Sequence, residues 1–225
     1  MQKFFSATIF LLFALCSRSQ QLSQITFSGA STLSSLSFSI DQGILIRISE
    51  DGKVLEWGSE LASERSSNYY APKLQPYMGR IIYYGTEADT INRGKIRSIG
   101  TCVIKYYDAF ELEEKRGKVK SIGMVNLDYY TKFENLNFKG KLRLVGSTML
   151  DYYSPFENDA YKGKLKIVGN TPISYYSTFQ DKGKIKSIGT VSYDWNPSQF
   201  RNQTVGTANT NLYRQNINGI TYILR

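Results

Sequence analysis

The chain of 225 residues contains no histidine and only two cysteines. The missing imidazole removes the commonest general base and the commonest transition-metal ligand. The absence of histidine and the scarcity of cysteine together argue against zinc, haem and cysteine-protease chemistry. We therefore expect a non-enzymatic protein with no catalytic residue, no metal and no cofactor.

The first 20 residues have the layout of a secretory signal peptide. Lys3 precedes an apolar run over residues 7–15, and small polar residues follow. The apolar run is too short to span a bilayer. We predict cleavage between Ser17 and Gln21. The mature protein is then expected to be periplasmic, on the cell surface or extracellular, with no transmembrane span.

Cleavage would leave Cys102 as the only cysteine, so the mature chain could form no internal disulfide. Lipid attachment through Cys16 is not favoured, because Leu15 occupies the position where a lipoprotein signal needs a small residue. The formal charge of +9 falls to +7 without the leader. The same excess lies between residues 94 and 189, where 17 basic residues accompany 10 acidic ones.

A seven-residue motif, Gly-Lys-apolar-basic-any-apolar-Gly, recurs along the chain. Five near-identical copies begin at Gly94, Gly117, Gly140, Gly163 and Gly183, and the central copies are 23 residues apart. Weaker copies, GKVLEWG and GRIIYYG, begin at residues 52 and 79. About seven short repeats are therefore expected.

Each motif is followed by a segment of alternating apolar and polar residues, which indicates a strand with one apolar face. Four of these segments contain a Tyr-Tyr pair. The first tyrosine falls on the apolar face and is expected in the core: Tyr106, Tyr129, Tyr152 and Tyr175. The second points the other way and is a candidate for ligand contact: Tyr107, Tyr130, Tyr153 and Tyr176.

A phenylalanine recurs ten residues after the closing glycine of the motif. The four copies are Phe110, Phe133, Phe156 and Phe179. We expect each ring to be a buried plug that fixes the loop returning to the next motif. The polar loops around it carry the changes in repeat length, as is usual for loops.

These patterns predict an all-β fold, either an antiparallel meander or a β-solenoid with β caps. Two short strands per repeat are too few for a propeller blade, and no helical run supports a leucine-rich or ankyrin unit. Residues 21–51 are expected to form an N-terminal β cap continuous with a repeat array over 52–195. Residues 196–225 are expected to form an irregular loop and a hairpin around Asn218-Gly219.

The motifs followed by YYDAF, YYTKFE, YYSPFE and YYSTF resemble the short β-hairpin repeats of bacterial exported proteins. They are distantly similar to WG-type repeats over about residues 52–195. The Trp-Gly pair that names that family occurs once, at Trp57-Gly58. MORN repeats share only the period. The resemblance implies a repeat β fold and no catalytic residue.

The two basic residues of each motif are two positions apart, so both are expected on one strand face. With the second tyrosines, the candidate binding residues are Lys118, Lys120, Lys141, Arg143, Lys164 and Lys166. Such a face would suit an anionic polymer, a glycan or an envelope protein, since aromatic rings beside cations can stack on sugars or bases. A solvated face that keeps the sheet soluble is the alternative. An exported location argues against nucleic acid.

The sequence thus favours a binding or scaffold module. A structural assembly subunit is the alternative, and a carbohydrate-active enzyme is a more distant one. The repeated acids are expected to balance the lysines and not to form a catalytic pair of unlike carboxylates. They are Asp128, Asp151 and Asp194 in one column, with Glu134 and Glu157 in another. Binding requires the second tyrosines and the basic residues to be exposed on the same side.

Overall fold

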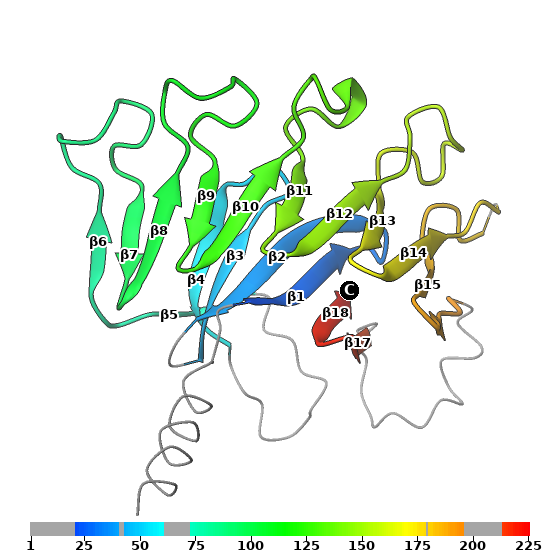
Figure 1. The fold of residues 1–225 in the computed structure, drawn as a ribbon. Coiled ribbons are helices and arrows are strands. Elements are labelled where there is room, and N and C mark those ends of the chain that lie inside the picture. The colour runs from blue at the N-terminus through cyan, green and yellow to red at the C-terminus, as the bar shows by residue number, and fades with distance from the viewer. Residues whose placement is uncertain (1–20, 41–42, 61–72, 179, 196–212) are drawn as a thin grey trace, which may run out of the picture.

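The computed structural model describes residues 21–40, 43–60, 73–178, 180–195 and 213–225. Within these residues the protein is all-β, as predicted, and its strands form two sheets (Figure 1). No helix of the described part is long and apolar enough to cross a membrane. The predicted leader, Phe179 and the predicted irregular loop over 196–212 lie outside the described residues.

The larger sheet is an antiparallel meander of eleven strands that follow one another in chain order. A single strand, β6 (Ile81–Tyr83), is followed by five hairpins. The hairpins are β7 (Ile96–Ile99) with β8 (Cys102–Tyr106), β9 (Val119–Ile122) with β10 (Val125–Tyr129), β11 (Leu142–Val145) with β12 (Thr148–Tyr152), β13 (Leu165–Val168) with β14 (Thr171–Tyr175), and β15 (Ile185–Ile188) with β16 (Val191–Ser192). The solenoid alternative is therefore not the observed arrangement.

The backbone conformation explains why glycine occupies both ends of the motif. The closing glycine is the first residue of a two-residue hairpin turn, as at Gly123, where Ile122 pairs with Val125. Its φ lies between +55° and +59° in the five motifs, a region that residues with a side chain rarely adopt. The opening glycine, such as Gly140 at φ +82°, likewise ends the incoming loop in a left-handed conformation. The motif is thus one strand bounded by two obligatory bends.

The smaller sheet joins the two ends of the described chain. Its seven strands lie in the order β17, β18, β1, β2, β3, β4, β5. Their bounds are β17 (Tyr213–Ile217), β18 (Ile220–Leu224), β1 (Gln21–Ser28), β2 (Thr32–Ile40), β3 (Ile44–Ile48), β4 (Val54–Ser59) and β5 (Gln75–Pro76). The hairpin at Asn218-Gly219 is confirmed, with positive φ at both residues, and β18 pairs in parallel with β1.

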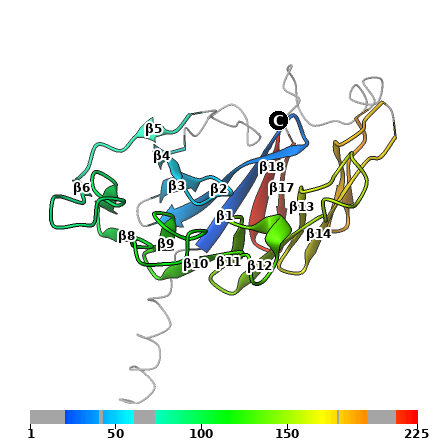
Figure 2. The ribbon, with the colours of Figure 1, turned by 90° about the horizontal axis from the view of Figure 1, so that it is seen from above.

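One hydrophobic core lies between the two sheets. Viewed from above, the repeat sheet curves around the smaller sheet (Figure 2). Apolar side chains from both sheets belong to the same buried cluster, among them Phe27, Phe38, Leu127 and Ile173. The expected core position of the first tyrosine is confirmed at Tyr129, Tyr152 and Tyr175, which are buried, while Tyr106 is half-buried.

Backbone hydrogen bonds also join the two sheets. Turns of the smaller sheet accept from the first amide of three repeat strands. The bonds run from Val119 to Gly52 at 3.0 Å, from Leu142 to Glu50 at 2.9 Å and from Ile185 to Ala30 at 2.8 Å. These bonds fix where the repeats lie along the smaller sheet, which apolar contact alone does not specify.

The two weak motif copies are not repeats of the array. GKVLEWG at residue 52 forms β4 of the smaller sheet. GRIIYYG at residue 79 forms β6, which pairs with β7 where the second strand of a preceding hairpin would lie. As in the second strands, a tyrosine that follows the strand bonds to the following repeat: the hydroxyl of Tyr84 donates to the Ile104 carbonyl. The cap predicted over 21–51 also differs from the structure, because these residues cover the inner face of the array in a separate sheet.

A substitution at Gly52 tests the contact between the two sheets. Its φ is +78°, and a Cβ there would lie 2.1 Å from the hydroxyl oxygen of Tyr129, a buried side chain bonded to the Val119 carbonyl. Gly29 has φ +59° with nothing within 4 Å of its Cβ position, so Gly29→Ala is the matched control. We expect Gly52→Ala to lower the free energy of unfolding by about 1–3 kcal/mol more than the control does, because of overpacking. Urea denaturation measures both, and equal losses would contradict this contact.

Candidate ligand-binding edge

The first lysine of each motif holds neighbouring repeats together. Its ammonium donates to the carbonyl of the next motif's opening glycine: Lys95 to Gly117, Lys118 to Gly140, Lys141 to Gly163 and Lys164 to Gly183. The same ammonium lies 4.5–5.1 Å from the ring centroid of a first tyrosine. Burial lowers the pKa of Lys118 and of Lys164 from the ordinary lysine value. The first lysines of the motifs, which the sequence placed on a basic binding face, are therefore held by structural contacts.

The second tyrosines also join successive repeats. Each donates its hydroxyl to a main-chain carbonyl of the following repeat at 2.8–3.0 Å: Tyr107 to Leu127, Tyr130 to Leu150, Tyr153 to Ile173 and Tyr176 to Tyr193. Tyr107 and Tyr130 are only 8% and 9% exposed, and Tyr153 and Tyr176 are half-buried. The exposure that the binding hypothesis required of this column was wrong at Tyr107 and Tyr130.

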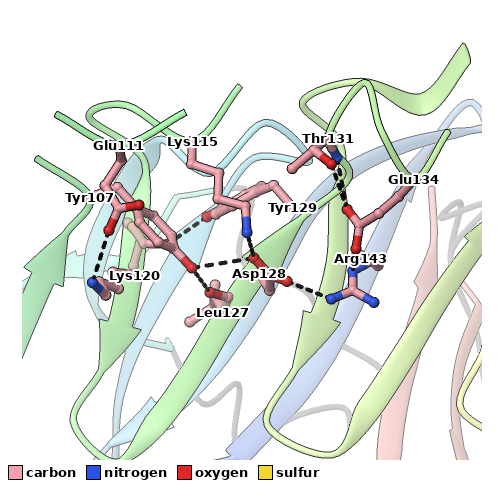
Figure 3. Close-up of polar contacts among 11 residues, drawn as sticks. Tyr107, Glu111, Lys115, Lys120, Leu127, Asp128, Tyr129, Thr131, Glu134 and Arg143 are labelled. Carbon is pink, nitrogen blue, oxygen red and sulfur yellow. Dashed lines mark hydrogen bonds and ion pairs between the residues drawn. The ribbon is translucent and has the colours of Figure 1, made fainter. Parts of the chain in front are cut away.

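The second basic residue of the motif contacts a different set of groups from the first, so the two columns do not form one basic face. It pairs with a glutamate of the preceding loop (Figure 3). The pairs are Lys120–Glu111 at 3.3 Å, Arg143–Glu134 at 3.2 Å and Lys166–Glu157 at 3.8 Å. Lys120 and Lys166 also lie over the second tyrosine rings of the preceding loops. Each such glutamate directly follows a repeated phenylalanine.

Asp128 is bonded by two basic side chains (Figure 3). Its carboxylate accepts from the ammonium of Lys115 and from the guanidinium of Arg143, and the Tyr107 hydroxyl lies 3.3 Å away. Burial raises the pKa of Asp128, but the hydrogen bonds from Lys115 and Arg143 outweigh it and hold the pKa below the ordinary value. Asp128 thus balances the basic residues, as the sequence predicted.

The phenylalanine column lies at the surface, so its predicted role as a buried plug was wrong. Phe110, Phe133 and Phe156 are 94%, 77% and 88% exposed. Phe179 lies outside the described residues. The core-facing aromatic contacts in two of these loops come from other residues, because Phe138 packs against Tyr130 and Tyr161 packs against Tyr153.

A short turn presents each phenylalanine. In the loop between β10 and β11 the amide of Glu134 donates to the Thr131 carbonyl, and the Glu134 carboxylate accepts from both the amide and the hydroxyl of Thr131. Phe133 is the third residue of this turn. Around Phe156 the amide of Glu157 donates to the Ser154 carbonyl, the Glu157 carboxylate accepts from the Ser154 amide, and the Ser154 hydroxyl accepts from the Phe156 amide. Around Phe110 the amide of Glu111 donates to the Asp108 carbonyl. The backbone of each phenylalanine therefore lies at the tip of a hydrogen-bonded turn.

The loops that carry these turns form one edge of the repeat sheet, which we call the loop edge. It comprises residues 85–93, 108–116, 131–139 and 154–162, and all four loops project from the same side in Figure 1. They contain nine acidic and six basic residues, for a net charge of −3. The basic excess of the array therefore lies on its strands and not at this edge.

The sequence also contains a signal for these turns, which lies in the spacing of their polar residues. Thr131-Lys-Phe-Glu134 and Ser154-Pro-Phe-Glu157 have the Ser/Thr-x-x-Glu spacing, in which the glutamate can bond back to the first residue. That spacing places the phenylalanine inside a closed turn, where its side chain points away from the backbone bonds. It would have favoured an exposed ring over a plug.

A groove of about 450 Å³ lies between the small-sheet turns and the repeats, next to the opening glycine Gly140. It is lined by Glu50, Asp51, Lys118, Lys139 and Lys141, among others. Lys118 and Lys141 are bound to the glycine carbonyls, and Lys141 also pairs with Glu50. Within the described residues, no cluster of three or more cysteine, aspartate or glutamate side chains could hold a metal ion. The groove is thus a structural junction.

The lowered pKa of Asp128 predicts a pH dependence. Its contribution to stability is present above the unfolded value of about 4 and is lost as the pH falls through the lower folded value. We expect Asp128→Asn to lower the free energy of unfolding by about 1–2 kcal/mol at neutral pH, because Lys115 and Arg143 lose their shared acceptor.

Urea denaturation between pH 7 and pH 3 would test this expectation, and the difference from wild type should shrink in acid. Asp159→Asn is the control, because Asp159 pairs with Lys162 in an exposed position and should change stability little. A difference that stays constant with pH would contradict the role given to Asp128.

No protein-family model matches the chain, and no curated protein or solved structure matches it either. The similarity to WG-type repeats therefore stays a prediction from the sequence. Among the described residues, the most unusual feature is the row of exposed phenylalanines at the loop edge.

Proposed function

We propose that this protein is an exported, non-enzymatic binding module, and that the loop edge is its binding surface. The observation that carries the proposal is the exposure of Phe110, Phe133 and Phe156 at equivalent positions of three successive repeats. The partner is an extended molecule of the cell envelope or its surroundings, contacted by one loop after another. Export rests on the leader predicted over residues 1–20.

Folding does not account for keeping these rings. The loops differ in sequence around them, as DAFELEEK, TKFENLNF and SPFENDAY, yet each retains phenylalanine. A side chain that is at least 77% exposed contributes little packing. Exposed apolar groups that gather on one part of a surface mark interaction sites, whereas isolated ones need no explanation. Recurrence at one exposed position supports binding as the reason.

The turns favour binding because their hydrogen bonds already order the loops before a ligand binds. Glu134 closes the turn around Phe133 by bonding Thr131, and Arg143 of the following strand holds Glu134 in turn. A ring presented on such a turn loses less conformational entropy when a ligand covers it than a ring on an open loop would. Three rings on one sheet also engage a long ligand together, which multiplies weak contacts.

The repeated acids support a non-enzymatic role. Asp128 is bonded by Lys115 and Arg143, and Glu134 is bonded by Thr131 and Arg143. Glycosidases need two carboxylates in unlike environments beside a substrate pocket. Carboxylates that fasten loops in successive repeats do not have that character.

An assembly subunit is the second candidate, and the observation that favours it is the outer edge of β6, which pairs with no other strand among the described residues. β6 begins the array without a hairpin partner of its own, and Tyr83 on it is 50% exposed. Unpaired strand edges can join to another chain. The pairing surface is only three residues long, Ile81–Tyr83, so we place assembly behind ligand binding.

The phenylalanine row can be removed without disturbing the core. We expect the triple variant Phe110→Ser, Phe133→Ser, Phe156→Ser to keep wild-type stability and to lose at least about tenfold in affinity for its ligand, a change of about 1.4 kcal/mol. The measurement is retention of the purified protein on immobilised polysaccharides, anionic polymers, a proline-rich peptide and lipid vesicles.

The matched control is Met78→Ser with Met124→Ser, which removes side chains that are 92% and 91% exposed and lie outside the loop edge. Equal retention of wild type and triple variant on every surface would overturn the proposed function. Equal loss in the triple variant and the control would do so too.

A further inference from the structure

We infer that the ligand of the loop edge is an uncharged linear polysaccharide, bound with one phenylalanine to each successive disaccharide of the sugar chain. This inference rests on the proposed function and names the ligand class for the same surface. It is carried by the spacing of the repeats, the chemistry of the phenyl ring and the charge of the loops.

The spacing of the repeats suits a chain with a disaccharide period. Successive repeats are offset by two strands, and neighbouring strands of a sheet lie 4.7–4.9 Å apart, so equivalent backbone positions of the sheet recur at about 10 Å. Extended β-linked pyranose chains advance by a similar length for every two sugars. Phe110, Phe133 and Phe156 are equivalent residues of successive repeats, so they would meet every second sugar of such a chain.

The phenyl ring suits the face of a sugar. A pyranose with equatorial hydroxyl groups has faces made of C–H bonds, and its hydroxyl groups lie around the rim. The aromatic face carries partial negative charge, so it attracts these C–H groups while excluding water. The rim hydroxyl groups stay hydrated or bond to loop carboxylates such as Glu113 and Asp159, which are mostly exposed. No polar group needs to be buried without a partner.

The same ring suits a proline-rich peptide poorly, although the lengths agree. A polyproline II helix advances about 9.3 Å per turn of three residues, and its carbonyls have no internal hydrogen bonds. Packing it on a surface strips water from some of those carbonyls, which then need donors. Grooves that bind such peptides combine aromatic rings with hydrogen-bond donors. Phenylalanine has no donor, and basic residues of these loops already pair with carboxylates: Lys115 with Asp128, Lys139 with Glu113 and Lys162 with Asp159. The row therefore favours sugar over peptide.

Charge argues against an anionic ligand at this edge. The loops have a net charge of −3, and the glutamate after each exposed phenylalanine is paired with a basic residue of the next strand: Glu111 with Lys120, Glu134 with Arg143 and Glu157 with Lys166. The three strand cations offset the charge of the loops, so the edge offers a polyanion or an anionic membrane no excess of cations to bind. The ion pair beside each ring also opposes insertion of the turn into lipid. An uncharged glycan meets neither obstacle.

The test is binding of the purified protein to soluble oligosaccharides of glucose and of N-acetylglucosamine, β1,4-linked, by calorimetry. We expect a hexasaccharide to bind at least about tenfold more tightly than a disaccharide, because it reaches three rings instead of one. Phe133→Ser, which removes the middle ring, should abolish most of that gain, and the Met78→Ser, Met124→Ser control should keep it. High salt should change the affinity little.

Retention on heparin, alginate, the proline-rich peptide or vesicles that the triple phenylalanine variant loses, without binding to the neutral oligosaccharides, would overturn this inference and leave the proposed function standing. Neutral-sugar binding that does not depend on chain length or on Phe133 would also overturn it. If the triple variant differs from wild type on no surface, the inference fails together with the proposed function.

Discussion

The interaction on which the structure depends is the bond from the first lysine of each repeat to the opening glycine carbonyl of the next. A half-buried ammonium must be hydrogen-bonded, and Lys118 finds its acceptor at Gly140 and an aromatic face at Tyr129. The left-handed glycine turns that carbonyl toward the lysine, and the tyrosine is the core residue of the same repeat. One contact therefore links the core, the strand start and the loop end of successive repeats.

The position of the surface loops follows from that link. With Gly140 held, the loop that precedes it is fixed at one end, and Tyr130 fixes its other end by bonding the Leu150 carbonyl of the next repeat. Arg143 then bonds Glu134 within the loop. The first lysine, both tyrosines and the second basic residue of the repeat each have a partner in the framework, whereas Phe133 is mostly exposed. The framework and the binding surface thus use different columns of the same repeat.

Much of the fold follows from period-two patterns, but the surface does not. Alternation within each second strand correctly places Ile104 and Tyr129 in the core, because parity holds while the strand is straight. Tyr130 comes directly after the end of β10, where parity no longer applies, and its hydroxyl reaches a carbonyl twenty residues away. Phe133 lies in a turn closed by side-chain hydrogen bonds, so its hydrophobicity alone wrongly predicted a buried ring. The motif at residue 52 was wrongly predicted to belong to the repeat array for a different reason. Strand pairing is non-local, and it places β4 in the smaller sheet.

The central claim is that the tyrosines hold the repeats together while the phenylalanines face outward. Hydroxyl-radical footprinting read by mass spectrometry tests it directly, with modification rates corrected for the intrinsic reactivity of each ring. The account predicts rapid modification of Phe110, Phe133 and Phe156 and protection of Tyr107 and Tyr130 in the folded protein. Protected phenylalanines beside reactive tyrosines would contradict it and would return the binding surface to the tyrosine column.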